Sequence, residues 1–418
     1  MTKKFLLISV LIMLAIGIAG ASFLFKRSSD SKITATNPNS STTNNNPKKN
    51  TFAKNLSRGQ CQGTGTVTFS NLPMAISDIG NVQPYGIMVG AHVIPTSHGY
   101  ISPADFRGPR DQYPVYAIAD GYIVNVSHRG EAVGDNLDPS RVTDEYQLWF
   151  EHSCTFYTYY DLLTSLSADL QLVVGKLTGF QNKNVRIPIK AGQVVGRIGG
   201  QTVDFGVWNF EKKPAFFANP NSYEEDRPYL DDMFKYFNEP LKNQLLVKAV
   251  RVVEPRSGRV DYDMAGKMVG GWFKDGSGGF QGPPGIQDTL GRRAWDGHLA
   301  IAYDFIDPSA IKFSVGNWQG AATQFAVKGN TPDPATIGVE SGMIKYELTE
   351  GGYVDGDTGH TVMLDRVVAN PKLKSQNQVK GTALAQLITP DKLKIELFPN
   401  KTAAEVTAFT TAAQIYTR

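Results

Sequence analysis

Short runs of strand-forming residues, separated by turns, restrict the fold of this chain more than any other feature. Residues 113–126 read as two strands joined by a turn at Asp120-Gly121, where the apolar and β-branched residues stop. Similar runs recur to the C-terminus, for example Leu299–Phe305 and Leu393–Phe398. With 41 glycines and 23 prolines among them, strands and turns are favoured over long helices. The sequence therefore predicts a mostly β protein made of antiparallel sheets.

The length of the chain favours two folded domains, since 418 residues exceed what one hydrophobic core usually supports. The pattern of the sequence changes near Val247, and this change marks the boundary. We expect a first β domain over residues 58–245, with one helix from Tyr229 to about Asn238. A second β-rich domain, an antiparallel barrel or sandwich, is expected over residues 246–418.

The N-terminal segment, residues 1–27, contains an uncharged run from Phe5 to Phe25 that is bounded on both sides by basic residues. A helix of this length spans roughly 30 Å of hydrocarbon, which predicts a transmembrane signal-anchor. The small residues Ala19–Ala21 resemble a cleavage site, and the alternative is a protein secreted after removal of a signal peptide. Either interpretation places the body of the protein outside the cytoplasm, and the first adds contact with the cell membrane.

Residues 28–57 are rich in Ser, Thr and Asn, and we expect a disordered linker because such a segment buries little apolar surface. The net charge of +3 is too weak to predict nucleic-acid binding. The chain has two cysteines, Cys61 and Cys154, which are candidates for a disulfide in an exported protein. Two separately buried thiols are the alternative.

Four segments of the first domain follow one another in a characteristic order. They are Pro114–Ile123, Tyr160–Leu163, Lys190–Gly199 and Phe205–Val207. In this order they resemble the lysostaphin-like zinc metallopeptidases, peptidoglycan endopeptidases that cut peptide cross-links in the bacterial cell wall. The resemblance covers roughly residues 92–209. It implies a compact antiparallel sheet core related to the lipoyl-type sandwich, in an exported bacterial protein.

The resemblance also implies a zinc ion, held in that family by two histidines and one aspartate with the fourth position open for water. His98 and Asp204 lie at or near the positions of the first and last metal ligands, and His92 is a further candidate. Without a metal, both histidines would cap turns around Pro95, and Asp204 would be a hydrogen-bonded carboxylate at a strand edge. His128 is expected in an exposed loop, because Arg129-Gly130 follows it.

Several positions depart from the family pattern and leave the domain degenerate. The family's last His-x-His strand reads Thr202-Val203-Asp204 here, and Leu162 stands where an auxiliary histidine is expected. Because most catalytic positions are changed, we do not expect the family's usual mechanism. The leading hypothesis is a membrane-tethered cell-envelope protein that binds a cell-wall polymer or an envelope partner. The alternatives are an active metal-dependent peptidoglycan hydrolase with an altered His/Asp zinc site, and a purely structural envelope protein.

Overall fold

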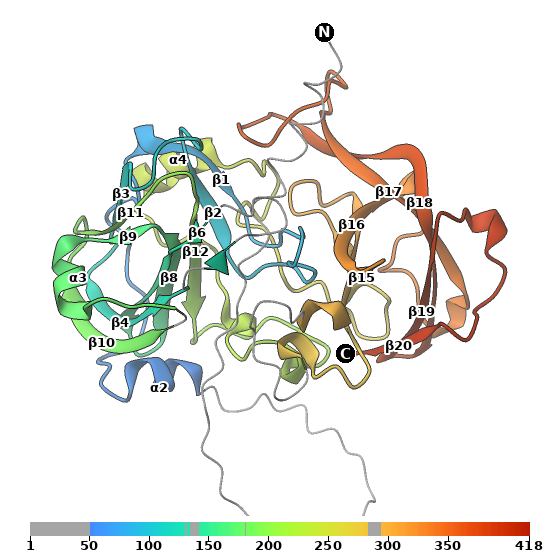
Figure 1. Cartoon of the computed structure of the whole chain (residues 1–418), viewed down its shortest axis with the longest axis horizontal. Helices are drawn as coiled ribbons and strands as arrows, with labels where there is room; N and C mark the ends of the chain where they lie inside the picture. Colours follow the sequence, from blue (N-terminus) through green and yellow to red (C-terminus); the bar gives the residue numbers. More distant parts are fainter. Residues whose placement is uncertain (1–50, 130–131, 134–141, 180, 283–293) are drawn as a thin grey trace, which may run out of the picture.

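The computed structural model describes residues 51–129, 132–133, 142–179, 181–282 and 294–418 (Figure 1). Two bodies of β-structure lie side by side, a layered sheet formed by the earlier residues and a barrel formed by the later ones. The expected fold class is confirmed, because antiparallel sheets are followed by a closed antiparallel barrel.

The predicted transmembrane anchor is corrected by the structure. In the described part of the chain, no helix is long and apolar enough to cross a membrane. The longest described helix, α4 (Glu239–Lys248), has 10 residues, whereas a membrane-spanning helix needs about 20. Residues 1–27, to which the anchor was assigned, lie outside the described residues.

A seven-stranded antiparallel sheet forms the centre of the first body. Its order is β1 (Ile79–Gln83), β2 (Gly99–Pro103), β12 (Val203–Asn209), β8 (Phe156–Leu163), β7 (Tyr146–Ser153), β4 (Gly121–His128) and β10 (Asn182–Ile189). Every residue of β8 is buried, because the strand is central and both of its faces are covered. A run of aromatic residues in this strand therefore forms core, and it presents no binding surface to solvent.

Smaller elements complete the first body. A three-stranded sheet contains β3 (Tyr113–Tyr116), β11 (Val194–Ile198) and β9 (Ser165–Leu166), and its apolar residues share one core with the large sheet. The strands β5 (Ala132–Val133) and β6 (Val142–Thr143) form a two-stranded sheet. The α-helices are α2 (Phe52–Ser57), α3 (Ala168–Val174) and α4. Short 3-10 helices occur in both bodies: η2 (Ile76–Asp78), η3 (Pro220–Ser222) and η4 (Arg227–Tyr229) precede the barrel, and η5 (Gly279–Gln281), η6 (Ala294–Gly297), η7 (Lys328–Asn330), η8 (Val339–Ser341) and η9 (Ala403–Glu405) lie between its strands.

Two helices differ from the expectations. Helix α4 begins at Glu239, after the predicted Tyr229–Asn238 range, because the side chain of Asn238 accepts a hydrogen bond from the Leu241 amide and caps the helix there. Helix α2 lies within the range assigned to the disordered linker. It is held by its own apolar residues, since Leu56 is buried and the Phe52 ring contacts Trp149 at a centroid distance of 5.1 Å.

The second body is a closed eight-stranded antiparallel barrel. Its strands are β13 (Gly270–Lys274), β14 (His298–Tyr303), β15 (Ile311–Trp318), β16 (Ala321–Val327), β17 (Ile344–Asp355), β18 (Pro371–Thr389), β19 (Lys392–Pro399) and β20 (Gln414–Thr417). Alternate residues point inward, as the period of two in a strand requires. Phe313, Val315, Tyr346 and Leu348, for example, lie in one buried cluster.

The barrel contacts the loop that joins β1 to β2. The Gly90 amide donates to Gln324 Oε1 at 2.8 Å, and Gln324 Nε2 donates back to the Gly90 carbonyl at 2.9 Å. Apolar residues on both sides of the junction, among them Ile87 and Phe305, share a buried cluster. The loop is therefore fixed by the barrel as well as by the sheet.

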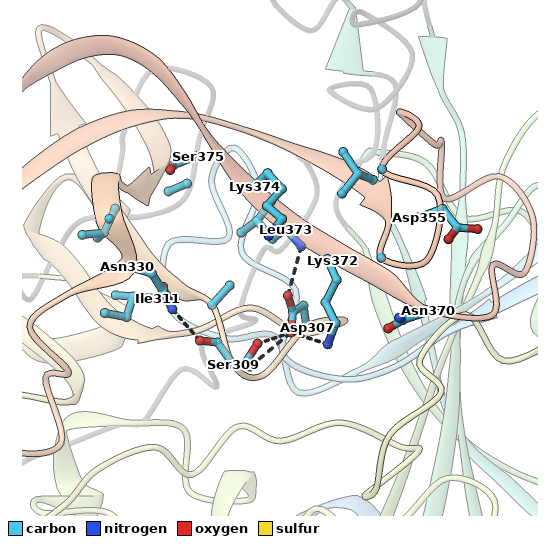
Figure 2. A pocket seen from close by; sticks show the side chains of 17 residues that line it. Asp307, Ser309, Ile311, Asn330, Asp355, Asn370, Lys372, Leu373, Lys374 and Ser375 are labelled. Atoms are coloured by element: carbon cyan, nitrogen blue, oxygen red, sulfur yellow. Dashed lines mark hydrogen bonds and ion pairs between the residues drawn. The ribbon is translucent and has the colours of Figure 1, made fainter.

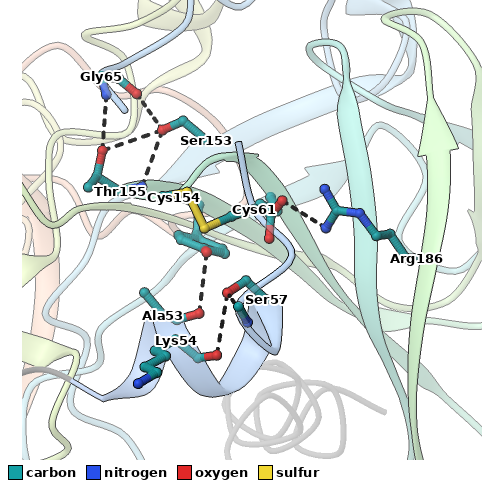
Figure 3. Close-up of a disulfide and its surroundings, with 12 residues drawn as sticks. Ala53, Lys54, Ser57, Cys61, Gly65, Ser153, Cys154, Thr155 and Arg186 are labelled. Carbon is teal, nitrogen blue, oxygen red and sulfur yellow. Dashed lines mark hydrogen bonds and ion pairs between the residues drawn. A yellow bond between two sulfur atoms is a disulfide. The ribbon is translucent and has the colours of Figure 1, made fainter. Parts of the chain in front are cut away.

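Cys61 and Cys154 form a disulfide (Figure 3). Cys154 lies in the turn between β7 and β8, and its amide donates to the Gly63 carbonyl at 3.0 Å. The Ser153 hydroxyl next to it donates to the Gly65 carbonyl at 2.6 Å. The bond and its neighbours attach the N-terminal described segment to the sheet. A disulfide is typical of proteins outside the cytoplasm and suggests an extracytoplasmic location.

Removing this disulfide is expected to lower the free energy of unfolding. The two cysteines are 93 residues apart, and the loop-entropy model gives a cost of about 4.6 kcal/mol for a loop of that length. The measurement is urea unfolding of the double variant Cys61→Ser/Cys154→Ser beside the oxidised protein. Reduced wild-type protein should match the variant. Equal unfolding midpoints for the variant and the oxidised protein would contradict the prediction.

Candidate functional site

His98 and Asp204, two of the candidate metal ligands, meet at one place in the seven-stranded sheet. His98 immediately precedes β2, and Asp204 lies near the start of β12, where it pairs with Tyr100 of β2. His98 Nε2 is 3.4 Å from Asp204 Oδ2 and 3.1 Å from Tyr100 Oη. The histidine ring therefore contacts side chains of the sheet through Nε2.

His92, the third candidate, lies near this pair. Its ring is 5.5 Å from the His98 ring, centroid to centroid, in an edge-on arrangement. Its backbone pairs with that of Val89 within the loop between β1 and β2. Across the described ranges, however, no group of three or more His, Cys, Asp or Glu side chains is arranged to hold a metal ion.

A buried ion pair occupies the neighbouring position. Asp161 of β8 lies directly opposite Asp204 in the register between β8 and β12. Arg129 follows the end of β4, and its Nε donates to Asp161 Oδ1 at 3.0 Å while Nη2 donates to Oδ2. Side-chain exposure is only 9% for the arginine and 2% for the aspartate. We call His92, His98, Arg129, Asp161 and Asp204 the polar centre.

Further hydrogen bonds satisfy the carboxylate of the ion pair. Asp161 accepts from the Leu162 amide at 2.7 Å and from Gln147 Nε2 at 2.8 Å. Charges buried in a protein are retained only where such partners compensate for lost hydration. On the arginine side, Nη1 is buried and has no hydrogen-bond partner in the part of the chain that the structure describes. Arg129 therefore has a buried donor without a partner among the described residues.

Burial and neighbouring charges shift the pKa values of His98 and Asp204. Burial, followed by the nearby His92 and Arg129, holds the pKa of His98 well below its usual value. Burial, followed by the charge of Asp161, raises the pKa of Asp204 well above its usual value, and Arg129 opposes this rise. These shifts favour the neutral form of each group.

Sequence reasoning missed the arginine. His128 was expected in an exposed loop, but it and the following Arg129 are both buried, with 2% and 7% of their surface exposed. The pairing depends on Asp161, 32 residues later in the sequence, and no local pattern reveals that distance. The sequence feature that could have indicated it is a basic residue directly after the predicted strand that became β4.

The residues of the polar centre do not match the zinc site that the resemblance implies. A catalytic zinc takes three protein ligands and keeps one position for water. Here both oxygens of Asp161 accept hydrogen bonds from a guanidinium, and His98 Nε2 already contacts two side chains. The arrangement is a hydrogen-bonded cluster of side chains. No step through a metal follows from it.

Comparisons with known proteins give weak similarities of fold. A scan of protein-family models finds no match, and a search of curated proteins finds none either. A zinc-containing peptidase from Vibrio cholerae is 18% identical with a TM-score of 0.20, over 34% of this chain and 37% of that one. Lysostaphin from Staphylococcus simulans is 11% identical with a TM-score of 0.23, over 74% of this chain and 100% of that one. A solution structure of lysostaphin gives 13% and 0.21, over 64% and 96%. TM-scores this low carry no argument about chemistry.

Breaking the ion pair from one side is expected to destabilise the fold more than removing both charges. Arg129→Met leaves a buried carboxylate without its cation, which costs about 3–5 kcal/mol. Arg129→Met/Asp161→Asn keeps an acceptor oxygen and removes the charge, so at least half of that loss should return. Urea unfolding measures both variants.

A matched control is Lys190→Met, which breaks the exposed pair of Lys190 with Asp120 and should change stability little. Equal losses for the single and double variants would show that the charge of Asp161 does not determine the cost.

The histidines of the polar centre predict a loss of stability in mild acid. Burial, with help from Arg129 and Arg227, lowers the pKa of His92 to about 4. Between about pH 6.5 and 4 the unfolded chain binds a proton that the folded chain does not, so this contribution is lost as pH falls. From pH 7 to pH 5, His92→Gln should lose about 1–2 kcal/mol less unfolding free energy than the wild type. Parallel pH profiles for the two proteins would contradict the prediction.

Proposed function

We propose that this chain is an extracytoplasmic cell-envelope protein whose first domain, residues 58–245, binds cell-wall material without cleaving it. The observation that carries the proposal is the Arg129–Asp161 ion pair inside the polar centre. In the family that the sequence resembles, the corresponding region holds a zinc ion. Here a fixed guanidinium supplies the positive charge.

Electrostatics supports binding over metal-dependent hydrolysis. A divalent cation beside Asp161 would be repelled by the arginine, because like charges at short range in a buried site interact strongly. It would also have to displace two hydrogen bonds to the Asp161 carboxylate. Asp204 favours its neutral form, in which a carboxyl group is a poor metal ligand. Each of these effects lowers metal affinity.

The chemistry of the unused donor points to the kind of ligand. Guanidinium groups bind carboxylates and carbonyl oxygens, and a partly desolvated arginine does so strongly. Cell-wall peptides carry both groups. The buried Arg129 Nη1 therefore fits a peptide oxygen, with His98 and Tyr100 beside it as further polar partners. This ligand class follows from the family resemblance together with the arginine.

The test combines binding, hydrolysis and metal content. The protein should sediment with insoluble peptidoglycan, release no free amino groups from it, and behave the same with and without a chelator. Arg129→Lys keeps the charge and loses the planar fork, so binding should fall at least about fivefold. Lys176→Ala, which removes an exposed lysine outside the polar centre, serves as the matched control and should bind normally.

Two outcomes would overturn the proposal. Near one zinc per chain, lost in His98→Ala and accompanied by chelator-sensitive release of amino groups, would establish the hydrolase alternative. Failure to sediment with peptidoglycan, in protein whose unfolding transition is intact, would remove the cell wall as the ligand.

A further inference from the structure

A cavity of about 580 Å³ lies on the barrel, beneath the long hairpin formed by β17 and β18 (Figure 2). Its size is that of a site for a small ligand or a short peptide. Its floor is apolar, with Ala310, Ala326 and Leu373 in one buried cluster. Lysines of β18 line the wall.

One edge of β18 is unpaired where it borders this cavity. The strand pairs with β17 from Pro371 to Ala385, but with β19 only from Gly381 to Thr389. Within the described residues, no strand pairs with the second edge of its first half. The residues 374–378 are exposed, so side chains of the barrel do not cover this stretch.

Hydrogen bonding shows which backbone groups face the open edge. The Leu373 amide donates to Asp307 Oδ2 at 3.1 Å, so it points away from β17 and toward the cavity that Asp307 lines (Figure 2). Backbone direction alternates along a strand, and Ser375, two residues on, directs its N–H and C=O to the same side. Because the Leu373 amide is bonded to Asp307, the edge presents the Ser375 N–H as a donor and the carbonyls of Leu373 and Ser375 as acceptors. Their spacing is the one that an added strand uses.

Only some of the charged side chains that line the cavity form ion pairs. Lys372 Nζ is 3.5 Å from Asp307 Oδ1, and this carboxylate also accepts from the Ser309 hydroxyl at 2.6 Å. Asp355 Oδ1 accepts two backbone amides of its own turn. Lys374, by contrast, forms no ion pair with any residue that the structure describes. Asp355 also has no ion-pair partner among the described residues, so the cavity carries no net charge, and Lys374 is the cation available to a carboxylate.

We propose that this cavity binds an extended acidic peptide, which adds to the open edge of β18 as a further strand. Backbone groups of Leu373 and Ser375 pair with the backbone of the peptide. One apolar side chain of the peptide enters the floor of the cavity, and the carboxylate of the next peptide residue pairs with Lys374. Lysines on exposed edges also prevent pairing between copies of a protein. An apolar cavity directly beneath the edge is not needed for that purpose, and it favours a bound peptide. The proposal does not depend on the function proposed for the polar centre.

The test uses a fluorescein-labelled peptide of about six alternating valines and glutamates, followed by fluorescence anisotropy. Lys374→Glu should weaken binding about tenfold. Ser375→Pro should weaken it similarly, because proline removes an amide that faces the peptide and leaves pairing with β17 intact. Lys392→Glu, on an exposed residue of β19, is the matched control and should bind within about twofold of the wild type.

Methylated peptides test the pairing on unaltered protein. Methyl groups on the amides of one peptide edge should abolish binding, while methyl groups on the other edge should leave it unchanged. Equal binding of the two methylated peptides would overturn strand addition. Equal loss in Lys392→Glu and Lys374→Glu would reduce the effect to general charge attraction and overturn the site. Absence of binding to the wild-type protein would overturn the proposal as a whole.

Discussion

The buried pair of Arg129 and Asp161 is the constraint on which the chemistry of the polar centre depends. Removing two charges from water is costly, and the cost is offset only by close pairing and by additional donors to the carboxylate. Gln147 and the Leu162 amide provide those donors. The pair also joins the end of β4 to β8, two strands separated in the sheet by β7. The same ion pair therefore holds the end of β4 near β8 and neutralises the buried carboxylate of Asp161.

The loop that carries His92 is fixed by a second set of contacts. Arg227, with 2% of its surface exposed, donates to the Pro95 carbonyl at 2.5 Å and pairs with Glu224. From the barrel, Gln324 forms two hydrogen bonds with Gly90. Because the two anchors lie on opposite sides of His92, movement of the barrel relative to the sheet would alter the position of this histidine. The position of His92 is thus linked to the junction between the two bodies.

Local sequence patterns predicted the strands, and they failed where long-range pairing decides the structure. The two strands in residues 113–126, which lie in different sheets, and the barrel class follow from residue type and turn chemistry. Arg129 could not be assigned, since its burial depends on a partner 32 residues away. Helix α4 was displaced because Asn238 was read as the end of a helix and in fact caps the start of one. The site resemblance identified His98 and Asp204 correctly as neighbours, but it did not predict the cation beside them.

The polar centre and the cavity on the barrel differ in the physical basis of recognition. In the polar centre the charges are enclosed, so recognition there depends on a few donors and on their protonation. In the peptide binding proposed at β18, the backbone is the recognition element and the side chain of Lys374 sets only the preferred charge. Enclosed sites discriminate between ligands by leaving a buried group unpaired when the wrong one binds. An open strand edge accepts many sequences of suitable charge. If both proposals hold, the chain combines selective binding in the sheet with broader peptide binding at the barrel.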